Sequence, residues 1–238
     1  MTIQEADWEI EMKTPPRIVI QAMLELQAGM NSKINTNWLN ANYPFLRAAL
    51  VESVEALEHY GWKWWKSQKP DISQVRIELI DIWHFVLSHY LVTECGNISK
   101  AAIKIENDWD SRPDIYFDGR QHISSELDFR EKLELMAASF AVRKPALPLL
   151  LALFDACEIS TEDLYIQYVC KNVLNHFRQD HGYRTGEYRK TWDGREDNEH
   201  MQELIEDLDS ASGSLAQDLY AALEKRYQML SKERRLGN

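Results

Sequence analysis

Four acidic side chains are spaced so that together they could hold a divalent cation. Glu52 and Glu55 stand three residues apart in one predicted helix, and Glu78 and Asp81 repeat this spacing in the next. A step of three residues on an α-helix leaves both side chains on one face, about a turn apart. Carboxylates gathered in this way repel one another unless a cation lies between them. Because Mg²⁺ binds carboxylate oxygens together with substrate phosphates and water, the pattern predicts a magnesium site.

The two helices that carry these acids are predicted from apolar periodicity. Most residues between 75 and 92 are apolar, and Glu78, Asp81 and His84 fall into one polar stripe of that helix. The plain alternative is a pair of amphipathic helices with solvated acidic faces, because glutamate is a good helix former. The acidic stripes contain almost no lysine or arginine to pair the acids, which favours the metal site. Glu58 lies one turn further along the acidic stripe of the first helix and is an alternative ligand.

The composition of the 238-residue chain favours one large helical domain. Apolar residues make up 45% of the chain, which is enough for a core, and only 9 glycines and 7 prolines are present. The formal net charge is −11, from 27 basic and 38 acidic residues. A surface this acidic disfavours nucleic acid and anionic membranes as partners, although a local basic patch can still bind phosphate.

The absence of targeting signals and the cysteine pattern predict a cytoplasmic protein. Acidic residues occupy the N-terminal stretch where a secretory signal would be basic. The longest apolar run, 146–154, is too short to span a bilayer and contains Pro148. The three cysteines form no CxxC pair and lie in apolar helical contexts, which is typical of reduced thiols in a core.

Apolar periodicity and turn residues divide the chain into helices with short connections. One helix begins after Asp71 or Ser73 and runs to about 92. The other predicted helices span about 17–30, 44–60, 98–106, 122–142, 146–157, 160–180, 196–210 and 213–233. We therefore expect a single all-α domain over 1–238, a multi-helix bundle whose four-helix core surrounds the carboxylate metal site. The segments outside the helices include a loose arm at 1–15 and a mobile surface loop at 107–121.

A second stretch, residues 168–198, concentrates basic side chains in an otherwise acidic protein. It carries six basic residues and three of the glycines, and the part after Asp180 is predicted to be an ordered, non-helical loop. Positively charged side chains on one helix face, followed by a glycine-punctuated loop, suit the binding of a polyphosphate. The side chains to which the pattern gives this role are Lys171, Asn175, Arg178, Tyr188 and Lys190. A solvated helix end followed by a surface loop explains the same spacing.

The two stretches together resemble the dimeric, all-α dUTPase family. The resemblance is carried by the paired acids, the WKWWK turn at 62–66, the sequence IELIDIWHF at 77–85, and the late motif KNVLNHFRQDHGYRTGEYRKTWDGREDN at 171–198. It covers about 17–92 and 160–200. The paired acids alone are typical of the wider all-α nucleotide pyrophosphohydrolases, whereas the turn and the late motif point to the deoxyuridine branch. The resemblance implies a homodimer that hydrolyses dUTP to dUMP and pyrophosphate with magnesium.

The resemblance also implies roles for individual residues. The four acids would hold two or more Mg²⁺ ions, and Glu52 or Glu55 would also orient and deprotonate the attacking water. The residues implied to bind the phosphates are Lys171, Asn175, Arg178, Lys190 and Asn198. Those implied to line the pocket for uracil and deoxyribose are Gln27, Trp62, Trp65, His84 and Phe85. His84 fits a hydrogen-bonded structural histidine equally well, and Glu196 and Asp197 also fit as caps of the next helix.

Three other functions are compatible with the sequence. The first is the same enzyme class acting on dCTP or a damaged nucleotide, because the metal site would be identical and only the base contacts would differ. The second is a di-iron carboxylate bundle, which needs an acid-x-x-His motif on each of two helices. Asp81 and His84 supply one such motif. The third is a helical regulatory protein that binds other proteins and retains a metal-binding cleft.

Overall fold

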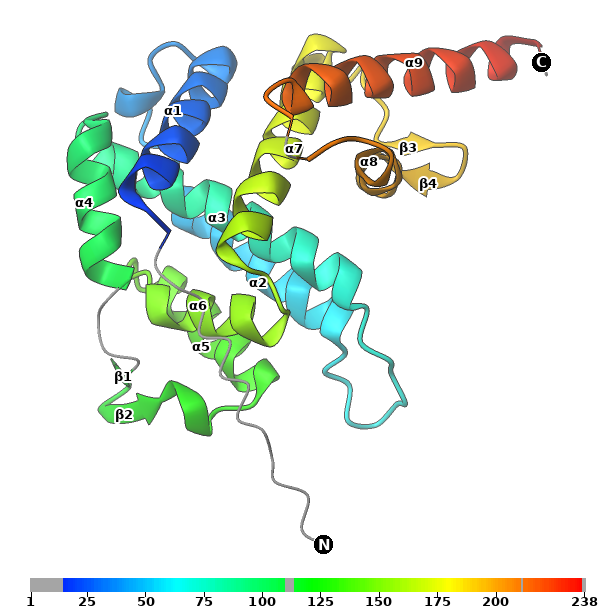
Figure 1. Cartoon of the computed structure of the whole chain (residues 1–238). Helices are drawn as coiled ribbons and strands as arrows, with labels where there is room; N and C mark the ends of the chain where they lie inside the picture. Colours follow the sequence, from blue (N-terminus) through cyan, green and yellow to red (C-terminus); the bar gives the residue numbers. More distant parts are fainter. Residues whose placement is uncertain (1–14, 110–113, 211, 237–238) are drawn as a thin grey trace, which may run out of the picture.

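The computed structural model describes residues 15–109, 114–210 and 212–236, and these residues are predominantly α-helical (Figure 1). The α-helices are α1 (Arg17–Ile34), α2 (Phe45–Tyr60), α3 (Ile72–Thr93), α4 (Ile98–Trp109), α5 (Phe129–Ala141), α6 (Leu147–Ala156), α7 (Thr161–Asp180), α8 (Asp197–Glu206) and α9 (Leu215–Leu236). Short 3₁₀ turns are η1 (Trp38–Asn40), η2 (Ser124–Glu126) and η3 (Tyr183–Thr185). The prediction of an all-α fold is confirmed. Within the described part of the chain, no helix has the length and apolar character needed to cross a membrane.

Helices α2 and α3 pack against each other along their lengths and form the centre of the fold (Figure 1). Gly61 ends α2 with a φ of 85°, a conformation that a side chain would strain. The Asp71 side chain accepts a hydrogen bond from the Gln74 backbone N–H and so caps the first turn of α3. Both ends of the intervening loop are therefore held by local interactions, which place the acids of α2 opposite those of α3.

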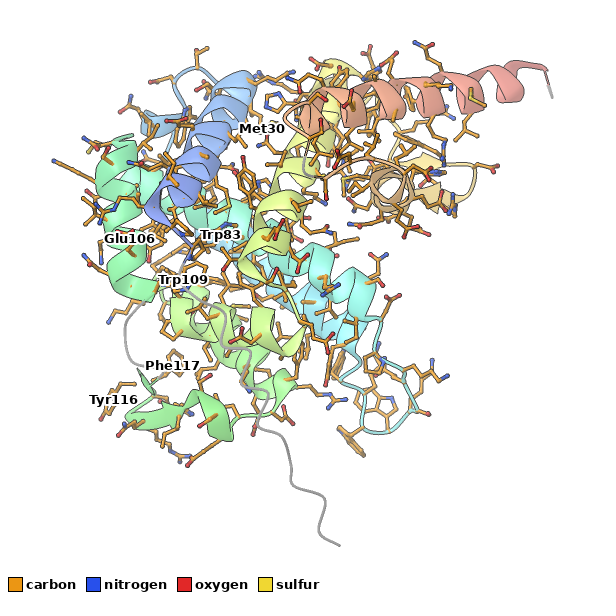
Figure 2. All side chains as sticks on the ribbon, viewed as in Figure 1. Met30, Trp83, Glu106, Trp109, Tyr116 and Phe117 are labelled. Atoms are coloured by element: carbon orange, nitrogen blue, oxygen red, sulfur yellow. The ribbon has the colours of Figure 1, made fainter. Side chains whose placement is uncertain are left out.

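Tryptophan packing joins α3 to its neighbours in the main core. Trp83 is fully buried, and its ring packs edge-to-face against Trp109 of α4 at a centroid distance of 5.4 Å (Figure 2). The Trp83 indole N–H lies 3.4 Å from the sulfur of Met23 on α1. Large aromatic side chains bury much apolar area, so this contact stabilises the helix that carries Glu78 and Asp81.

Helix α7 takes part in two separate hydrophobic cores. Its first half, up to Tyr168, belongs to the main core formed by α1 to α6. Its second half, from Cys170, belongs to a smaller core that includes Trp192, Leu219 and Leu223. In Figure 1 the chain continues from α7 into the β3 (Thr191–Trp192) and β4 (Arg195–Glu196) hairpin, α8 and α9, which gather around its C-terminal half. One continuous helix therefore links the acidic helices α2 and α3 to the rest of the basic stretch at 168–198, called the late segment below.

Several predicted helix boundaries differ from those in the structure. Helix α1 continues to Ile34, so the polar residues after Met30 are helical. Helix α5 begins at Phe129 and not near 122, because the capping box of Asp128 and Glu131 starts it there.

The predicted surface loop at 107–121 is wrong over most of its length. Residues 107–109 end α4, and β1 (Asp114–Phe117) pairs antiparallel with β2 (Arg120–Ile123). Asp118 and Gly119 have φ values of 51° and 71°, as a two-residue hairpin turn requires. Residues 110–113, like 1–14 of the predicted arm, lie outside the described residues.

Candidate active site

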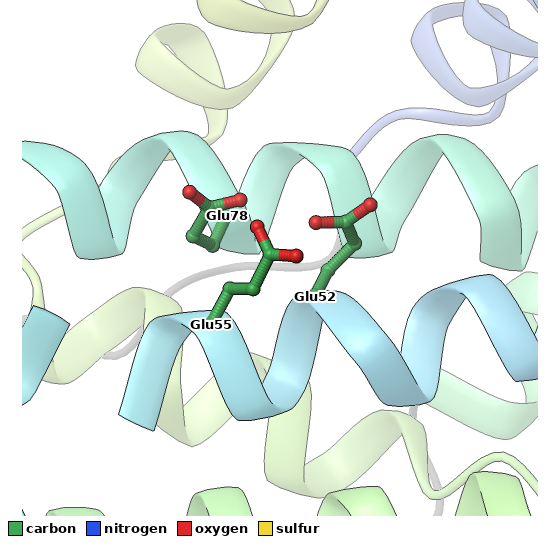
Figure 3. Close-up of side chains that lie close together, drawn as sticks. All are labelled: Glu52, Glu55 and Glu78. Atoms are coloured by element: carbon green, nitrogen blue, oxygen red, sulfur yellow. The ribbon is translucent and has the colours of Figure 1, made fainter. Parts of the chain in front are cut away.

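Three carboxylates from α2 and α3 converge on one point. Ligand oxygens of Glu52, Glu55 and Glu78 all lie within 4.8 Å of one another. Figure 3 shows Glu52 and Glu55 extending from α2 and Glu78 from α3, with their carboxylates in the space between the two helices. The three-residue spacing places the two acids of α2 on one face, as the sequence predicted. Hard oxygen donors this close together suit a small divalent cation.

The fourth predicted acid, Asp81, lies beside these carboxylates but is paired with a lysine. Its Oδ2 lies 2.9 Å from Nζ of Lys171, which is only 2% exposed. The same Nζ donates a hydrogen bond to Oδ1 of Asn198 at 2.7 Å. Lys171 therefore joins the acidic helix α3 to the late segment, and the charged groups from both stretches meet in one place.

Crowding of the acids perturbs their protonation. Burial, with the neighbouring charges of Asp81 and Glu55, raises the pKa of Glu52 to about 7. Burial, with the charges of Asp81 and Glu52, raises the pKa of Glu78 to about 8. Removing water from a carboxylate and placing like charges beside it both disfavour its ionised form. A bound cation would reverse this effect, because it favours the ionised form of each ligand.

We expect the thermal stability of the metal-free protein to fall as pH rises from about 5 to 8. In this range the folded protein retains protons on Glu52 and Glu78 that the unfolded chain, with an ordinary pKa of 4.5, has released. Unfolding therefore releases protons, and raising the pH favours the unfolded state. The measurement is the melting temperature in EDTA at several pH values.

The double variant Glu52→Gln, Glu78→Gln is the control for that measurement, because it removes the two titrating groups. Its melting temperature should depend less on pH than that of the wild type over the same range. Added Mg²⁺ should stabilise the wild type most at pH 8, where the ligands release their protons most readily. Equal slopes for the two proteins in EDTA would contradict the raised pKa values.

The late segment places a guanidinium at the cavity and holds it with a buried carboxylate. Arg178 donates from Nε and Nη2 to the two carboxylate oxygens of Asp197, both at 2.8 Å, and Asp197 is fully buried. The Tyr188 hydroxyl donates to the same carboxylate at 2.8 Å. Burial alone raises the pKa of Asp197, but the hydrogen bonds from Arg178 and Tyr188 outweigh it, and the pKa lies below its ordinary value. Asp197 therefore stays ionised and fixes the orientation of Arg178.

The loop after α7 begins at a glycine whose conformation determines its path. Gly182 has a φ of 83°, and a Cβ at this position would lie 2.6 Å from Oε2 of Glu187. The loop then turns through Gly186 and brings Lys190 to the cavity, with its ammonium 5.8 Å from the centre of the Tyr183 ring. The prediction of an ordered, non-helical segment after Asp180 is confirmed apart from the short turn η3.

Gln27 of α1 and His84 of α3 form a buried hydrogen-bonded pair at the cavity, supported by Tyr168 of α7. His84 Nδ1 lies 2.8 Å from Oε1 of Gln27, and the His84 ring stacks on Tyr168 at a centroid distance of 4.2 Å. The Tyr168 hydroxyl donates to the same Gln27 oxygen at 2.9 Å. Nε2 of His84 makes no hydrogen bond with any residue that the structure describes. Phe85, on the next position of α3, is half-buried and also lines the cavity.

These groups surround a single cavity of about 400 Å³. The predicted site residues that line it are Gln27, Glu52, Glu55, Glu78, Asp81, His84, Phe85, Lys171, Asn175, Arg178, Lys190 and Asn198. Among the residues lining it that the sequence did not single out are Met30, Asn31, Ile34, Phe45 and Gln179. Tyr188 does not line the cavity, because its hydroxyl is engaged with Asp197 behind Arg178.

The two predicted tryptophans are not brought to this cavity. Trp62 and Trp65 pack edge-to-face at a centroid distance of 5.2 Å in the loop after α2, where Trp65 is 57% exposed. The Trp62 indole N–H donates to Oε1 of Glu58 at 2.7 Å, and Lys63 pairs with the same carboxylate. Glu58 is therefore directed toward the loop and does not join the carboxylate cluster that includes Glu55.

Three buried partners of the site are not among the residues predicted from the sequence. Asn31 lies four residues after Gln27, a spacing that places the two side chains on one face of α1 and could have identified it. Asp197 was interpreted as a cap of α8, whereas Glu196 is the cap and Asp197 binds Arg178. Tyr168 shows no signal in the sequence, because nothing local indicates which helix its ring faces.

Comparison with known proteins identifies the chain at the family level. A family model described as dUTPase matches residues 19–183, well over half of the chain. The match includes all four acids and Arg178, and it ends before Lys190 and Asn198. A search of curated proteins gives no match.

Proposed function

The chain belongs to the all-α dUTPase family and is a dUTP diphosphatase, and from that premise we propose Mg²⁺-dependent hydrolysis of dUTP to dUMP and pyrophosphate at this cavity. The observation that carries the proposal is one cavity lined by carboxylates of α2 and α3 and by cationic side chains of α7 and the loop after it. Phosphoryl transfer depends mainly on positioning and on neutralising charge, which these two sets of groups can divide between them.

The donor set fits Mg²⁺, which prefers oxygen ligands and keeps positions for phosphate and water. We propose that Glu52, Glu55 and Glu78, whose oxygens lie within 4.8 Å of one another, hold two or more ions together with Asp81. At this position Mg²⁺ would neutralise charge on the phosphate oxygens and lower the pKa of a water molecule.

Glu52 and Glu55 have a second proposed role toward the attacking water. Both line the cavity on α2, with Glu55 exposed and Glu52 half-buried, so that water can reach them from the open side. In this role they orient the water and accept its proton as it attacks phosphorus. A well-placed general base typically contributes about 10²- to 10⁴-fold to a rate.

The phosphate chain is proposed to bind between the acids and the late segment. Lys171 and Arg178 are buried cations at the cavity, and their partners Asp81 and Asp197 hold them in place before a nucleotide arrives. Cationic side chains that are already held in place lose little conformational freedom when they bind phosphate. More of their interaction energy is therefore available to stabilise the transition state. Further polar groups from the same segment available to the phosphates are Asn175, Lys190 and Asn198.

The nucleoside is proposed to bind at the end formed by α1 and α3. Gln27 is a buried amide, and His84 and Phe85 offer a ring nitrogen and an aromatic surface beside it. An amide in a tight apolar wall can match the edge of uracil and leave no room for the methyl group of thymine. Contact of Phe85 with the sugar would disfavour a 2′-hydroxyl.

We propose that the protein is a homodimer, with a second copy covering the exposed face of α2. Val51 and Val54 on this face are 44% and 46% exposed, and an apolar groove lined by Tyr43 and Phe45 continues from it beside the cavity. Contiguous exposed apolar surface often marks an interface. Light scattering should give a mass twice the 27.9 kDa of the chain, and Val54→Arg should lower it. Trp62 and Trp65 would reach a nucleotide only at the site of another copy.

A substrate panel tests the proposed reaction. The purified chain with Mg²⁺ should release pyrophosphate from dUTP with a kcat/KM about 10²-fold above that for dTTP, since a pocket rejects a methyl group by about this factor. UTP and dCTP should also be poor substrates, and EDTA should abolish hydrolysis. Hydrolysis of dCTP without hydrolysis of dUTP would contradict the proposal.

A further inference from the structure

A chain of buried polar side chains leads from the cavity into the fold. Besides His84 and Gln27, it contains Asn31, Ser88 and Tyr168, and all five are at most 5% exposed. Each is hydrogen-bonded to the next with a distance between 2.8 and 3.1 Å. Buried polar chains are costly unless every member is satisfied, so their directions of donation are strongly constrained.

The Ser88 end sets the direction of donation along this series of hydrogen bonds. The Ser88 hydroxyl donates to the His84 carbonyl at 3.0 Å, so its oxygen is left to accept from Nδ2 of Asn31, also at 3.0 Å. Asn31 then presents Oδ1 to its other neighbour and accepts from Nε2 of Gln27 at 3.1 Å. Each amide carries its oxygen and its nitrogen on opposite sides, so the orientation of Asn31 also determines the orientation of Gln27.

Gln27 consequently turns Oε1 toward His84 and Tyr168. A carbonyl oxygen only accepts, so the proton between Gln27 Oε1 and His84 Nδ1 belongs to the histidine. The Tyr168 hydroxyl donates between this oxygen and the Met23 carbonyl, both at 2.9 Å. Burial also lowers the pKa of His84 to about 3, so the ring is neutral and carries one N–H.

We propose that Ser88, Asn31, Gln27 and Tyr168 hold His84 in the Nδ1-protonated tautomer and thereby present Nε2 to the cavity as a hydrogen-bond acceptor for a donor on the nucleotide. Nε2 is buried without a partner among the described residues, and His84 belongs to the lining of the cavity. Ser88 and Tyr168 do not line the cavity and act through His84, so they are positioning residues.

The proposal restricts what His84 can recognise, and this part depends on the proposed function. An acceptor cannot bind either carbonyl of uracil, so the available donors are N3–H of the base and the 3′-hydroxyl of the sugar. Cytosine carries no hydrogen on N3, and a site that requires one would leave a buried group unpaired with dCTP. The acceptor would therefore select for the uracil edge or for the position of the sugar.

The first test measures the tautomer without nucleotide, so it does not depend on the identity of the substrate. Two-bond ¹H–¹⁵N spectra of the full chain labelled in histidine distinguish a protonated ring nitrogen from a bare one. The chain has seven histidines, and the His84 signals are those lost in His84→Gln. We expect a protonated Nδ1 and a bare Nε2, whereas a protonated Nε2 would overturn the proposal.

Two variants, at opposite ends of the series of hydrogen-bonded side chains, test whether these hydrogen bonds set the tautomer of His84. Ser88→Ala and Tyr168→Phe each remove one hydroxyl, and Tyr168→Phe keeps the ring that stacks on His84. Both should give a mixture of tautomers and raise the KM for dUTP about three- to tenfold with kcat unchanged, as expected for the loss of one hydrogen bond. Tyr165→Phe, on an exposed position of α7, is the matched control. An unmixed tautomer in both variants overturns the proposal.

Nucleotide titrations identify the donor. dUMP should shift the Nε2 signal of His84, and the shift should be absent with either dCMP or 2′,3′-dideoxy-UMP, according to whether N3–H or the 3′-hydroxyl donates. Equal shifts with all three overturn the acceptor role. If dUMP does not bind at all, the proposed function fails. The tautomer of His84 in the free protein still shows whether the hydrogen-bonded side chains hold the ring in one form.

Discussion

Replacing Glu78 by glutamine is expected to lower kcat/KM for dUTP by at least about 10³-fold. Glu78 is one of three acids whose oxygens lie within 4.8 Å, and its side chain is the most buried of them. Glutamine keeps the shape but supplies no negative charge, so it weakens cation binding and leaves the phosphate charge less neutralised. The measurement is pyrophosphate release from dUTP over a range of Mg²⁺ concentrations.

The control for this variant is Glu25→Gln, an exposed acid on α1 away from the cavity. It changes the net charge of the protein by the same amount and should leave kcat/KM unchanged. Melting temperatures of both variants show whether the fold is kept. If Glu78→Gln retains activity within about tenfold of the wild type, less than a general base typically contributes, the carboxylate cluster is not the catalytic centre.

Replacing Asp197 by asparagine is expected to destabilise the fold by about 3 kcal/mol, because it leaves the buried guanidinium of Arg178 without a counter-charge. Arg178 is 8% exposed and donates two hydrogen bonds to this carboxylate. For a chain of this size the loss corresponds to a fall of about 6–12 °C in melting temperature. The KM for dUTP should rise as well, because Arg178 loses its fixed orientation.

Two further variants separate the buried charge from other effects. Asp193→Asn alters an exposed acid in the neighbouring turn and should leave the melting temperature unchanged. The double variant Arg178→Met, Asp197→Asn removes both charges and should be more stable than Asp197→Asn alone, since no unpaired ion remains. A double variant that melts below the single one would contradict the assignment of the loss to an unpaired charge.

Much of the fold and of the acidic half of the site could be predicted from local spacing. The presence and order of the helices follow from apolar periodicity, and the pairing of Glu52 with Glu55 follows from three-residue steps on a helix. The basic face of Lys171 and Arg178 was found in the same way. Each of these features depends only on neighbours along one element, which is the information that a sequence carries directly.

The features that were missed depend on where side chains from distant elements meet. The sequence shows that Trp65 is in a loop but not which way the loop points, because loops have no periodicity to orient them. The acidic Asp197 at a helix start looks like a cap, and only the position of α7 makes it the partner of Arg178. The hairpin around Asp118 was the exception, because its Asp-Gly turn is a recognisable signal that was not used.

The passage of α7 through both hydrophobic cores makes the register of that helix a determinant of the geometry of the cavity. No loop intervenes between Tyr168, which stacks on His84, and Lys171, which meets Asp81. Inserting one residue between them would rotate the part of α7 after the insertion by about 100° relative to the part before it. The side chains of Lys171 and Arg178 would then point away from the acids, although each hydrophobic core would keep the same residues. One uninterrupted helix therefore fixes the distance between the proposed nucleoside end and the proposed phosphate end of the site, whereas a surface loop could change its length.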